Sequence, residues 1–242
     1  MYQNIFLDIK KMKMHLWDDT KGHLEIPFRK YAYVKHSNGQ HVSLYGDRLK
    51  KVTQFDKDDP TLHESDVPPT TRFLVDQYGD SDEASVGHRI MFFDIEVEVT
   101  EGFPDVQKAQ NPITSIALYD STTEKYFTYV FDPNKRLKSY TKDDQVVEIY
   151  ETEYEMLNQF FQKYLEIRPT IISGWNSEFF DIPYLYNRAV RVLGPEVANL
   201  LSPISQVLYS EYKKKHTIAG VSSLDYLQLY RQFTFTQQSS YR

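Results

Sequence analysis

The sequence predicts an α/β domain with a mixed sheet over residues 88–242, preceded by a small, mostly β (α+β) domain over residues 1–87. Residues 89–99 alternate in polarity, as a half-buried strand does. Residues 153–167 carry apolar side chains at helical spacing, which predicts an amphipathic helix. Before residue 88 the chain instead has short apolar stretches separated by turn residues, for example at 37–39, which is typical of small β structures.

The second region has the element order strand, strand, strand, helix, strand, helix. The predicted elements are strands at 89–99, 113–120, 125–132 and 170–175, and helices at 153–167 and 181–193. Thr152 and Glu155 form a capping-box pattern at the start of the first helix. Pro183 is tolerable in the first turn of the second helix, and Gly194 is a stop signal at its end. This is the element order of a ribonuclease-H-like fold.

The first region is interpreted as short strands joined by polar connections. Apolar or aromatic stretches at 31–34 and 41–45 are candidate strands. Residues 56–69 are polar, acidic and contain three prolines, so they are predicted to form a loop or connector. Residues 80–87 are predicted to form a second connector, which places the domain boundary at their end.

Composition excludes several function classes. The chain has no cysteine, so disulfides, thiolate metal sites and cysteine nucleophiles are ruled out. A net charge of −6 argues against a simple electrostatic nucleic-acid binder, but not against a metal-dependent nuclease, whose clustered carboxylates are offset by bound cations. No apolar run is long enough to span a bilayer, so no membrane partner is expected. We expect a cytoplasmic protein, in the host cell cytoplasm if it is viral.

One face of the strand at 89–99 changes from apolar to acidic along its length. That face holds Ile90 and Phe92, followed by Asp94, Glu96 and Glu98. A solvated edge strand would explain the acids but not the apolar start. A strand buried at one end, with acids emerging at the other, is a way to place a metal site at the rim of a sheet.

A second polar segment lies at 175–181, between a predicted buried strand and a predicted helix. Asp181 by itself could be a helix-terminal acid that interacts with the helix dipole. The strand before it should lie beside the strand at 89–99, however, and Asp181 would then face Asp94. Sites made of carboxylates suit Mg²⁺ or Mn²⁺, and two such ions about 4 Å apart can catalyse phosphodiester hydrolysis without a side-chain nucleophile.

Several segments together resemble the exonuclease region of family B DNA polymerases of the T-even bacteriophage type. They are FDIEV (93–97) with EGFP (101–104), GWNSEFFDIPY (174–184) continued by YNR (186–188), SLDY (223–226) and FTFT (233–236). The resemblance covers about the last 155 residues well and is vague before them. It implies an N-terminal polymerase domain followed by a 3′→5′ proofreading exonuclease.

The resemblance assigns roles at the acidic site. Asp94 and Asp181 would hold both ions of a Mg²⁺ or Mn²⁺ pair, and Glu96 would complete one ion site. Asn176 would position the terminal nucleotide. Phe103 would wedge against unstacked bases near the 3′ end, although a packed loop phenylalanine is the alternative. The family pattern gives Glu98 no role, and we expect it at the surface.

The DNA partner would be the single-stranded 3′ end of a primer, and the protein partner would be the remaining polymerase polypeptide. Phe180 would contribute to the DNA groove. Residues 204–220 are predicted to form a β-hairpin that helps to separate primer from template, with a solvated charged loop as the alternative. Its DNA-binding candidates are Tyr212, Lys213, Lys214 and Lys215, the lysines contacting phosphate.

The sequence departs from the family pattern at the third exonuclease motif, Tyr-x-x-x-Asp. After Asp181 the chain contains only Asp225, and Val221 stands where the motif has its tyrosine. The match of Asp225 in the family is a helix residue outside the metal site. We therefore expect a chain that ends before the exonuclease is complete, with weak ion binding and poor activity. The alternative is a catalytically deficient nucleic-acid-binding or docking subunit of a split polymerase.

Overall fold

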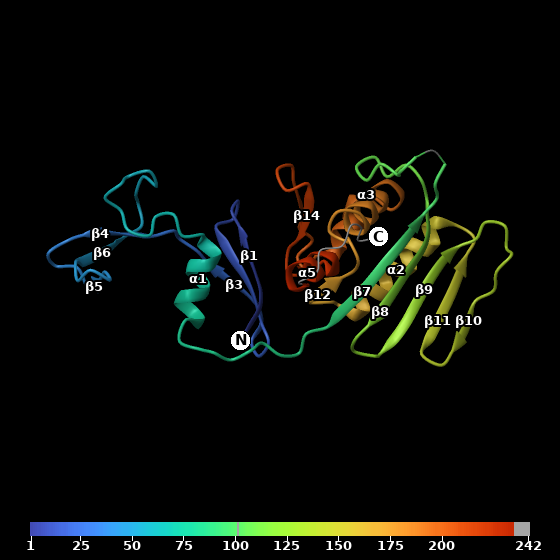
Figure 1. The fold of residues 1–242 in the computed structure, drawn as a ribbon, viewed down its shortest axis with the longest axis horizontal. Helices are drawn as coiled ribbons and strands as arrows, with labels where there is room; N and C mark the ends of the chain where they lie inside the picture. Colours follow the sequence, from blue (N-terminus) through green and yellow to red (C-terminus); the bar gives the residue numbers. More distant parts are fainter. Residues whose placement is uncertain (101, 235–242) are drawn as a thin grey trace. The chain divides into compact units, whose positions relative to one another are not determined.

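A computed structural model describes residues 1–100 and 102–234 of the 242-residue chain. The chain divides into two compact units, Met1–Val86 and Gly87–Arg242. We call them the N-terminal unit and the C-terminal unit, and Figure 1 identifies their elements by colour and label. None of the helices in the described ranges has the length and apolar character needed to cross a membrane.

The N-terminal unit contains two small antiparallel sheets and one helix. The first sheet has the order β1-β2-β3 and the second β4-β6-β5. Their bounds are β1 Tyr2–Asp8, β2 Lys13–Asp18, β3 Gly22–Pro27, β4 Ala32–Lys35, β5 His41–Val42 and β6 Arg48–Val52. The predicted β-rich character is therefore confirmed, but the stretch at 41–45 pairs over two residues only.

Helix α1 (Pro69–Tyr78) covers one face of the first sheet. Phe73 packs there with Met14, Leu16 and Phe28, all of them buried. This helix was not predicted from the sequence, and the connector predicted over residues 56–69 runs into its first residue. Pro69 occupies the start of the helix, where its missing N–H costs nothing, so the proline opens α1 rather than marking a loop.

The C-terminal unit is built on a seven-stranded mixed sheet with the order β10-β11-β9-β8-β7-β12-β15. Its strands are β7 Ile90–Val97, β8 Ile113–Asp120, β9 Lys125–Phe131, β10 Tyr140–Lys142, β11 Gln145–Tyr150, β12 Ile171–Ser173 and β15 Ser222–Ser223. β7, β8 and β9 form the predicted antiparallel meander. β12 lies parallel to β7, which confirms the predicted neighbourhood of these two strands.

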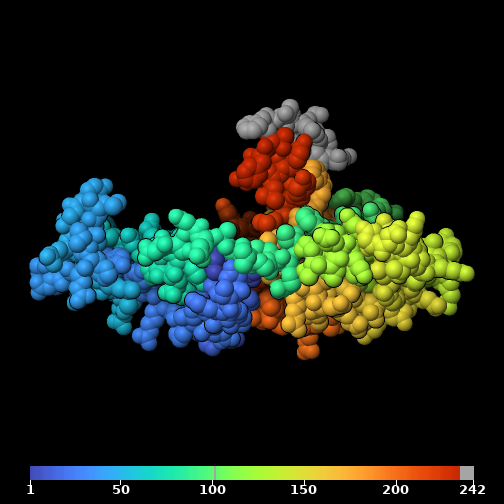
Figure 2. Space-filling view, turned by 90° about the horizontal axis from the view of Figure 1, so that it is seen from below, coloured from blue at the N-terminus to red at the C-terminus, as the bar shows by residue number. Residues whose placement is uncertain are grey.

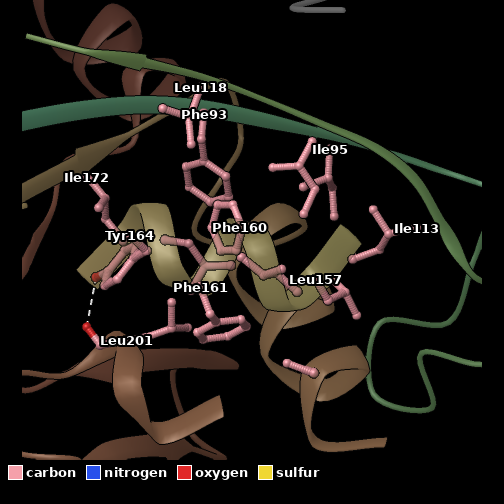
Figure 3. Packing of buried hydrophobic residues seen from close by; sticks show 14 of the residues in the cluster. Phe93, Ile95, Ile113, Leu118, Leu157, Phe160, Phe161, Tyr164, Ile172 and Leu201 are labelled. Atoms are coloured by element: carbon pink, nitrogen blue, oxygen red, sulfur yellow. Dashed lines mark hydrogen bonds between the residues drawn. The ribbon is translucent and has the colours of Figure 1, made fainter. Parts of the chain in front are cut away.

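Helix α2 (Glu153–Ile167) has the predicted bounds and forms the centre of the core. Thr152 caps it, since its hydroxyl oxygen accepts the Glu155 N–H at 3.2 Å. Figure 3 shows side chains of β7, β8 and α2 interlocking, and Tyr164 donates a 2.7 Å hydrogen bond to the Leu201 carbonyl at the edge of this cluster. The labelled residues are Phe93, Ile95, Ile113, Leu118, Leu157, Phe160, Phe161, Tyr164, Ile172 and Leu201.

The remaining elements follow β12. They are α3 Asp181–Val192, α4 Pro195–Ala198, the 3₁₀ turn Asn199–Leu201, β13 Val207–Ser210, β14 Lys215–Ile218 and α5 Tyr226–Phe233. β13 and β14 form the predicted hairpin. The elements β10, β11, β15, α4 and α5 were not predicted from the sequence. In Figure 2, α5 (red) projects from the body of this unit. β11 and β15 each pair in parallel with a strand distant in sequence, which local patterns do not reveal.

The acidic face of β7 is more open than predicted. Phe92 on this face is 43% exposed and lies beside Tyr119, with ring centroids 6.3 Å apart. The opposite face of β7, with Met91, Phe93 and Ile95, is buried in the core that α2 supplies. The expectation of a strand whose second face is buried at its start is therefore wrong. The alternation itself is confirmed.

Candidate active site

The loop after β12 delivers Asp181 to the edge of β7. Gly174 begins this loop where the backbone comes very close to β7, because a Cβ at this position would lie 2.5 Å from the Phe93 carbonyl oxygen. Asn176 adopts a left-handed conformation with φ of 59°. The Ser177 carbonyl then accepts the Ile182 N–H at 2.9 Å, which starts helix α3. This local turn places the first residue of α3, Asp181, against the sheet.

Asp181 contacts β7 directly. Its Oδ1 accepts the Ile95 N–H at 3.1 Å, and the side chain is 3% exposed. Burial raises the pKa of Asp181 to about 7, the Ile95 N–H opposes this rise, and the charge of Asp94 adds to it. Partial desolvation also raises the pKa of Asp94, although this residue is exposed at the surface of β7. The structure thus brings the two predicted aspartates close enough for the charge of Asp94 to make ionisation of Asp181 harder.

Glu96 lies on the same face of β7 as Asp94, two residues further along the strand, and is exposed. Within residues 1–100 and 102–234, no group of three or more His, Asp or Glu side chains is gathered closely enough to hold an ion. The geometry therefore shows an aspartate pair with a glutamate nearby. Glu98 is exposed, as expected.

The donor chemistry of this pair suits a hard divalent cation. Across the described residues, no Lys, Arg or His forms an ion pair with Asp94, Glu96 or Asp181. Buried carboxylates normally have a cation or a metal as partner, because an isolated charge loses its hydration. An oxygen-rich site without an internal counter-charge fits Mg²⁺ or Mn²⁺.

Phe103 and Phe180 form an aromatic pair near this site. Phe103 is 79% exposed, and its ring centroid lies 5.1 Å from that of Phe180, the residue directly before Asp181. Phe180 in turn packs on Tyr184 at 5.7 Å. Phe103 is therefore in contact with the loop that carries Asp181, while most of its surface is free to meet another molecule.

Helix α3 also holds the loop that carries Phe103, a connection that the sequence analysis missed. Tyr184 donates to the Asn111 carbonyl at 2.8 Å, and Asn187 donates to the Val106 carbonyl at 2.9 Å. Arg188 donates to two further carbonyls of the loop, at residues 109 and 110, and forms an ion pair with Glu153 of α2. The two partners of this ion pair lie 35 residues apart, so no local pattern marks them.

The tip of the β13–β14 hairpin is exposed to solvent, and its base contacts the loop that precedes Asp181. Tyr212 is 95% exposed, Lys213 is exposed, and Lys214 pairs with Glu211 of the same turn at 2.9 Å. Lys215 instead forms a 2.7 Å ion pair with Glu178, in the loop that precedes Asp181. Lys215 thus connects the hairpin to the acidic site.

Comparison with known proteins agrees with this architecture. Residues 80–242 match the family described as DNA polymerase family B, exonuclease domain. Over 182 residues, 63% of the chain, the sequence is 33% identical to the DNA-directed DNA polymerase of Escherichia phage RB69. Over 176 residues, 60% of the chain, it is 35% identical to the DNA-directed DNA polymerase of Enterobacteria phage T4. These alignments cover 20% and 19% of the two relatives.

The chain therefore belongs to the family B DNA polymerases and contains their exonuclease domain. The resemblance to phage polymerases inferred from the motifs is confirmed. The match extends beyond phages, with 40% identity over 101 residues, 41% of the chain and 11% of the relative, to DNA polymerase 1 of Saccharolobus solfataricus. The chain spans about a fifth of the length of the phage relatives.

Proposed function

We propose that the acidic site removes nucleotides from the 3′ end of single-stranded DNA, as the 3′→5′ exonuclease part of a DNA polymerase. The observation that carries this proposal is the pair of Asp181 and Asp94 without an internal cation, at the edge between β7 and β12. The relatives are named DNA-directed DNA polymerases of phages, so we expect DNA as the substrate and an infected cell's cytoplasm as the location.

Asp94 and Asp181 would hold a pair of Mg²⁺ or Mn²⁺ ions, and Glu96 would contribute an oxygen at one side. When bound, such ions supply a hydroxide for attack on the phosphodiester and stabilise the departing oxygen. The chain contributes position and charge: the Ile95 N–H holds Oδ1 of Asp181 against β7. The chain has no cysteine, and this chemistry needs no side-chain nucleophile.

Phe103, Phe180 and Asn176 would guide the single strand to this pair. The Phe103 ring has the exposure that base stacking requires, and it contacts Phe180, the residue directly before Asp181. Tyr212, Lys213 and Lys214 at the hairpin tip are in solvent, where they could contact the strand. The remaining polymerase polypeptide is the expected protein partner. No observation favours the alternative of a docking subunit without activity.

The test is a Mn²⁺ titration of the chain with 5′-labelled single-stranded DNA, followed by calorimetry of Mn²⁺ binding alone. We expect weak ion binding and slow shortening from the 3′ end, because no third carboxylate is gathered close to Asp94 and Asp181 among the described residues. Asp94→Ala should abolish both. Asp132→Asn is the control, since Asp132 is buried but bonds to its own turn at residues 134–137. Cleavage that persists in Asp94→Ala would refute the proposed site.

The proposed contact of Phe103 with DNA is tested separately, by measuring the binding of single-stranded DNA without Mn²⁺. Phe103→Ala should weaken binding of single-stranded DNA by about 1–3 kcal/mol, the contribution of one stacked base. Tyr140→Ala removes another exposed aromatic ring, from the far edge of the sheet, and serves as the control. Unchanged affinity in Phe103→Ala would assign this residue to loop packing.

A further inference from the structure

Asp225 is a buried carboxylate that makes more hydrogen bonds than its local role requires. It is 2% exposed and caps helix α5, where its Oδ1 accepts the Leu227 N–H at 2.9 Å. The same oxygen also accepts the Asn176 N–H at 3.1 Å, and Oδ2 accepts the Glu178 N–H at 3.0 Å. Two of its three bonds therefore reach the loop that delivers Asp181.

The backbone around Asp225 is fixed to the same part of the sheet. β15 pairs in parallel with β12, and Ser173 donates to the Leu224 carbonyl at 2.7 Å. The Tyr226 N–H bonds to the Gly174 carbonyl at 2.9 Å. Asp225 thus stands between a bond from the Ser173 hydroxyl of β12 and a backbone bond to Gly174 of the loop. The residues on both sides of Asp225 are therefore bonded to the same segment that its carboxylate contacts.

The loop itself transmits this constraint to Asp181. Asn176 lies in the left-handed region, and its carbonyl accepts the N–H groups of Phe179 and Phe180 at 3.2 Å each. Because the residues between 176 and 181 form one hydrogen-bonded turn, a shift of the two bonded amides would move the start of α3. The Asp181 contact with Ile95 depends on that position.

We propose that Asp225 is a positioning residue of the acidic site, holding the 175–180 loop so that Asp181 reaches the Ile95 N–H beside Asp94. This inference deepens the proposed exonuclease function and rests on it for its consequence in activity. It gives a role to an aspartate that the sequence analysis placed outside the metal site on a helix; Asp225 does lie outside the aspartate pair, as the cap residue of α5.

A carboxylate is needed here for a geometric reason. Three N–H donors converge on two oxygens, and an asparagine would present its own NH₂ group to one of them. A neutral serine or asparagine would cap α5 about as well. Either neutral residue would also remove a negative charge near Asp181. The charge of Asp225 raises the Asp181 pKa, in addition to the effects of burial and of Asp94. The loop contacts explain a charged residue in this position.

Amide hydrogen exchange at Ile95, measured by NMR in EDTA, reports the Asp181 contact without metal or activity. Asp225→Asn should raise Ile95 exchange at least about tenfold, since a loss of 1.4 kcal/mol is tenfold in an equilibrium. Asp132→Asn is a matched control: Asp132 is 3% exposed and also accepts three backbone N–H groups, all within its own turn. It should leave Ile95 unchanged. Wild-type protection of Ile95 in folded Asp225→Asn would overturn the inference.

Asp225→Ser separates the helix cap from the loop contacts and serves if Asp225→Asn does not fold. Serine can still accept the Leu227 N–H but is too short to reach Glu178 as well. We expect faster exchange at Ile95 with unchanged exchange at Leu229 in α5. If Ile95 stays protected in Asp225→Ser, the carboxylate does not position the loop, and the inference fails.

Hydrolysis of labelled single-stranded DNA provides the second readout. Both Asp225 variants should lower kcat at least tenfold, because Asp181 loses its position beside Asp94. KM for DNA should change less than kcat does, because Phe103 and the hairpin tip stay in place while only Asn176 and Phe180 move with the loop. A rise of KM at constant kcat would overturn a role at the aspartate pair. If the wild-type chain neither binds Mn²⁺ nor cleaves DNA, the proposed function fails, while Ile95 exchange still decides the inference about Asp225.

Discussion

Replacing Asp181 with asparagine should stabilise the metal-free protein at alkaline pH. Asparagine has the shape of aspartate and can still accept the Ile95 N–H, but it carries no charge. A pKa raised from 3.8 to about 7 corresponds to at most about 4 kcal/mol of unfavourable free energy for the ionised carboxylate. Burial causes most of this rise, and Asp94 adds to it. Asp181→Asn should recover part of that free energy.

The pH dependence has a defined sign. The folded protein holds the Asp181 proton more tightly than the unfolded chain, so the contribution of Asp181 is most favourable below pH 3.8 and is lost as pH rises through about 7. The stabilisation by Asp181→Asn should therefore approach its full size at pH 8 and fall to roughly 2 kcal/mol at pH 5. Urea unfolding in EDTA, at both pH values, measures the difference.

A carboxylate of opposite character provides the control. The backbone N–H groups of Leu137, Arg136 and Asn134 lower the pKa of Asp132 despite its burial, so its charge stabilises the fold. Asp132→Asn should therefore destabilise the protein at pH 8, while Asp181→Asn stabilises it. Adding Mn²⁺ should raise the stability of the wild type and not of Asp181→Asn. If Asp181→Asn is less stable than the wild type at pH 8 in EDTA, the reasoning is refuted.

Three further substitutions test the packing and hydrogen bonds of the C-terminal unit. Gly174→Ala should lower the free energy of unfolding by about 1–3 kcal/mol, because its Cβ would lie 2.5 Å from a β7 carbonyl oxygen; an unchanged urea midpoint would contradict this. Arg188→Met should cost about 3–5 kcal/mol in the same titration by leaving Glu153 buried without its cation, and adding Glu153→Gln should recover part of the loss. Tyr164→Phe should cost about 1–3 kcal/mol by leaving the Leu201 carbonyl unpaired, which a thermal melt with unchanged Tm would disprove.

Local patterns predicted the elements that contain their own signals. Helix α2 has its capping residues Thr152 and Glu155 and a full apolar stripe, so its bounds could be predicted from the sequence. The β7–β9 meander joins segments that are neighbours in the sequence. Its strands could therefore be predicted from local patterns, such as the alternation of apolar and polar residues along β7. Helix α1 was missed because the proline at its start also fits a loop.

At the acidic site, too, the local motifs could be predicted from the sequence and the long-range contacts could not. The sequence by itself predicted which residues would carry the chemistry, because Asp94, Glu96 and Asp181 stand in motifs with a recognisable spacing. Only the tertiary structure decided that Asp181 bonds to the Ile95 N–H and that Asp225 bonds to the loop before it. These contacts join residues 47 to 86 positions apart, across parallel strands whose pairing no local pattern encodes. Burial and mutual repulsion, which set the pKa of Asp181, arise only once the strands have assembled.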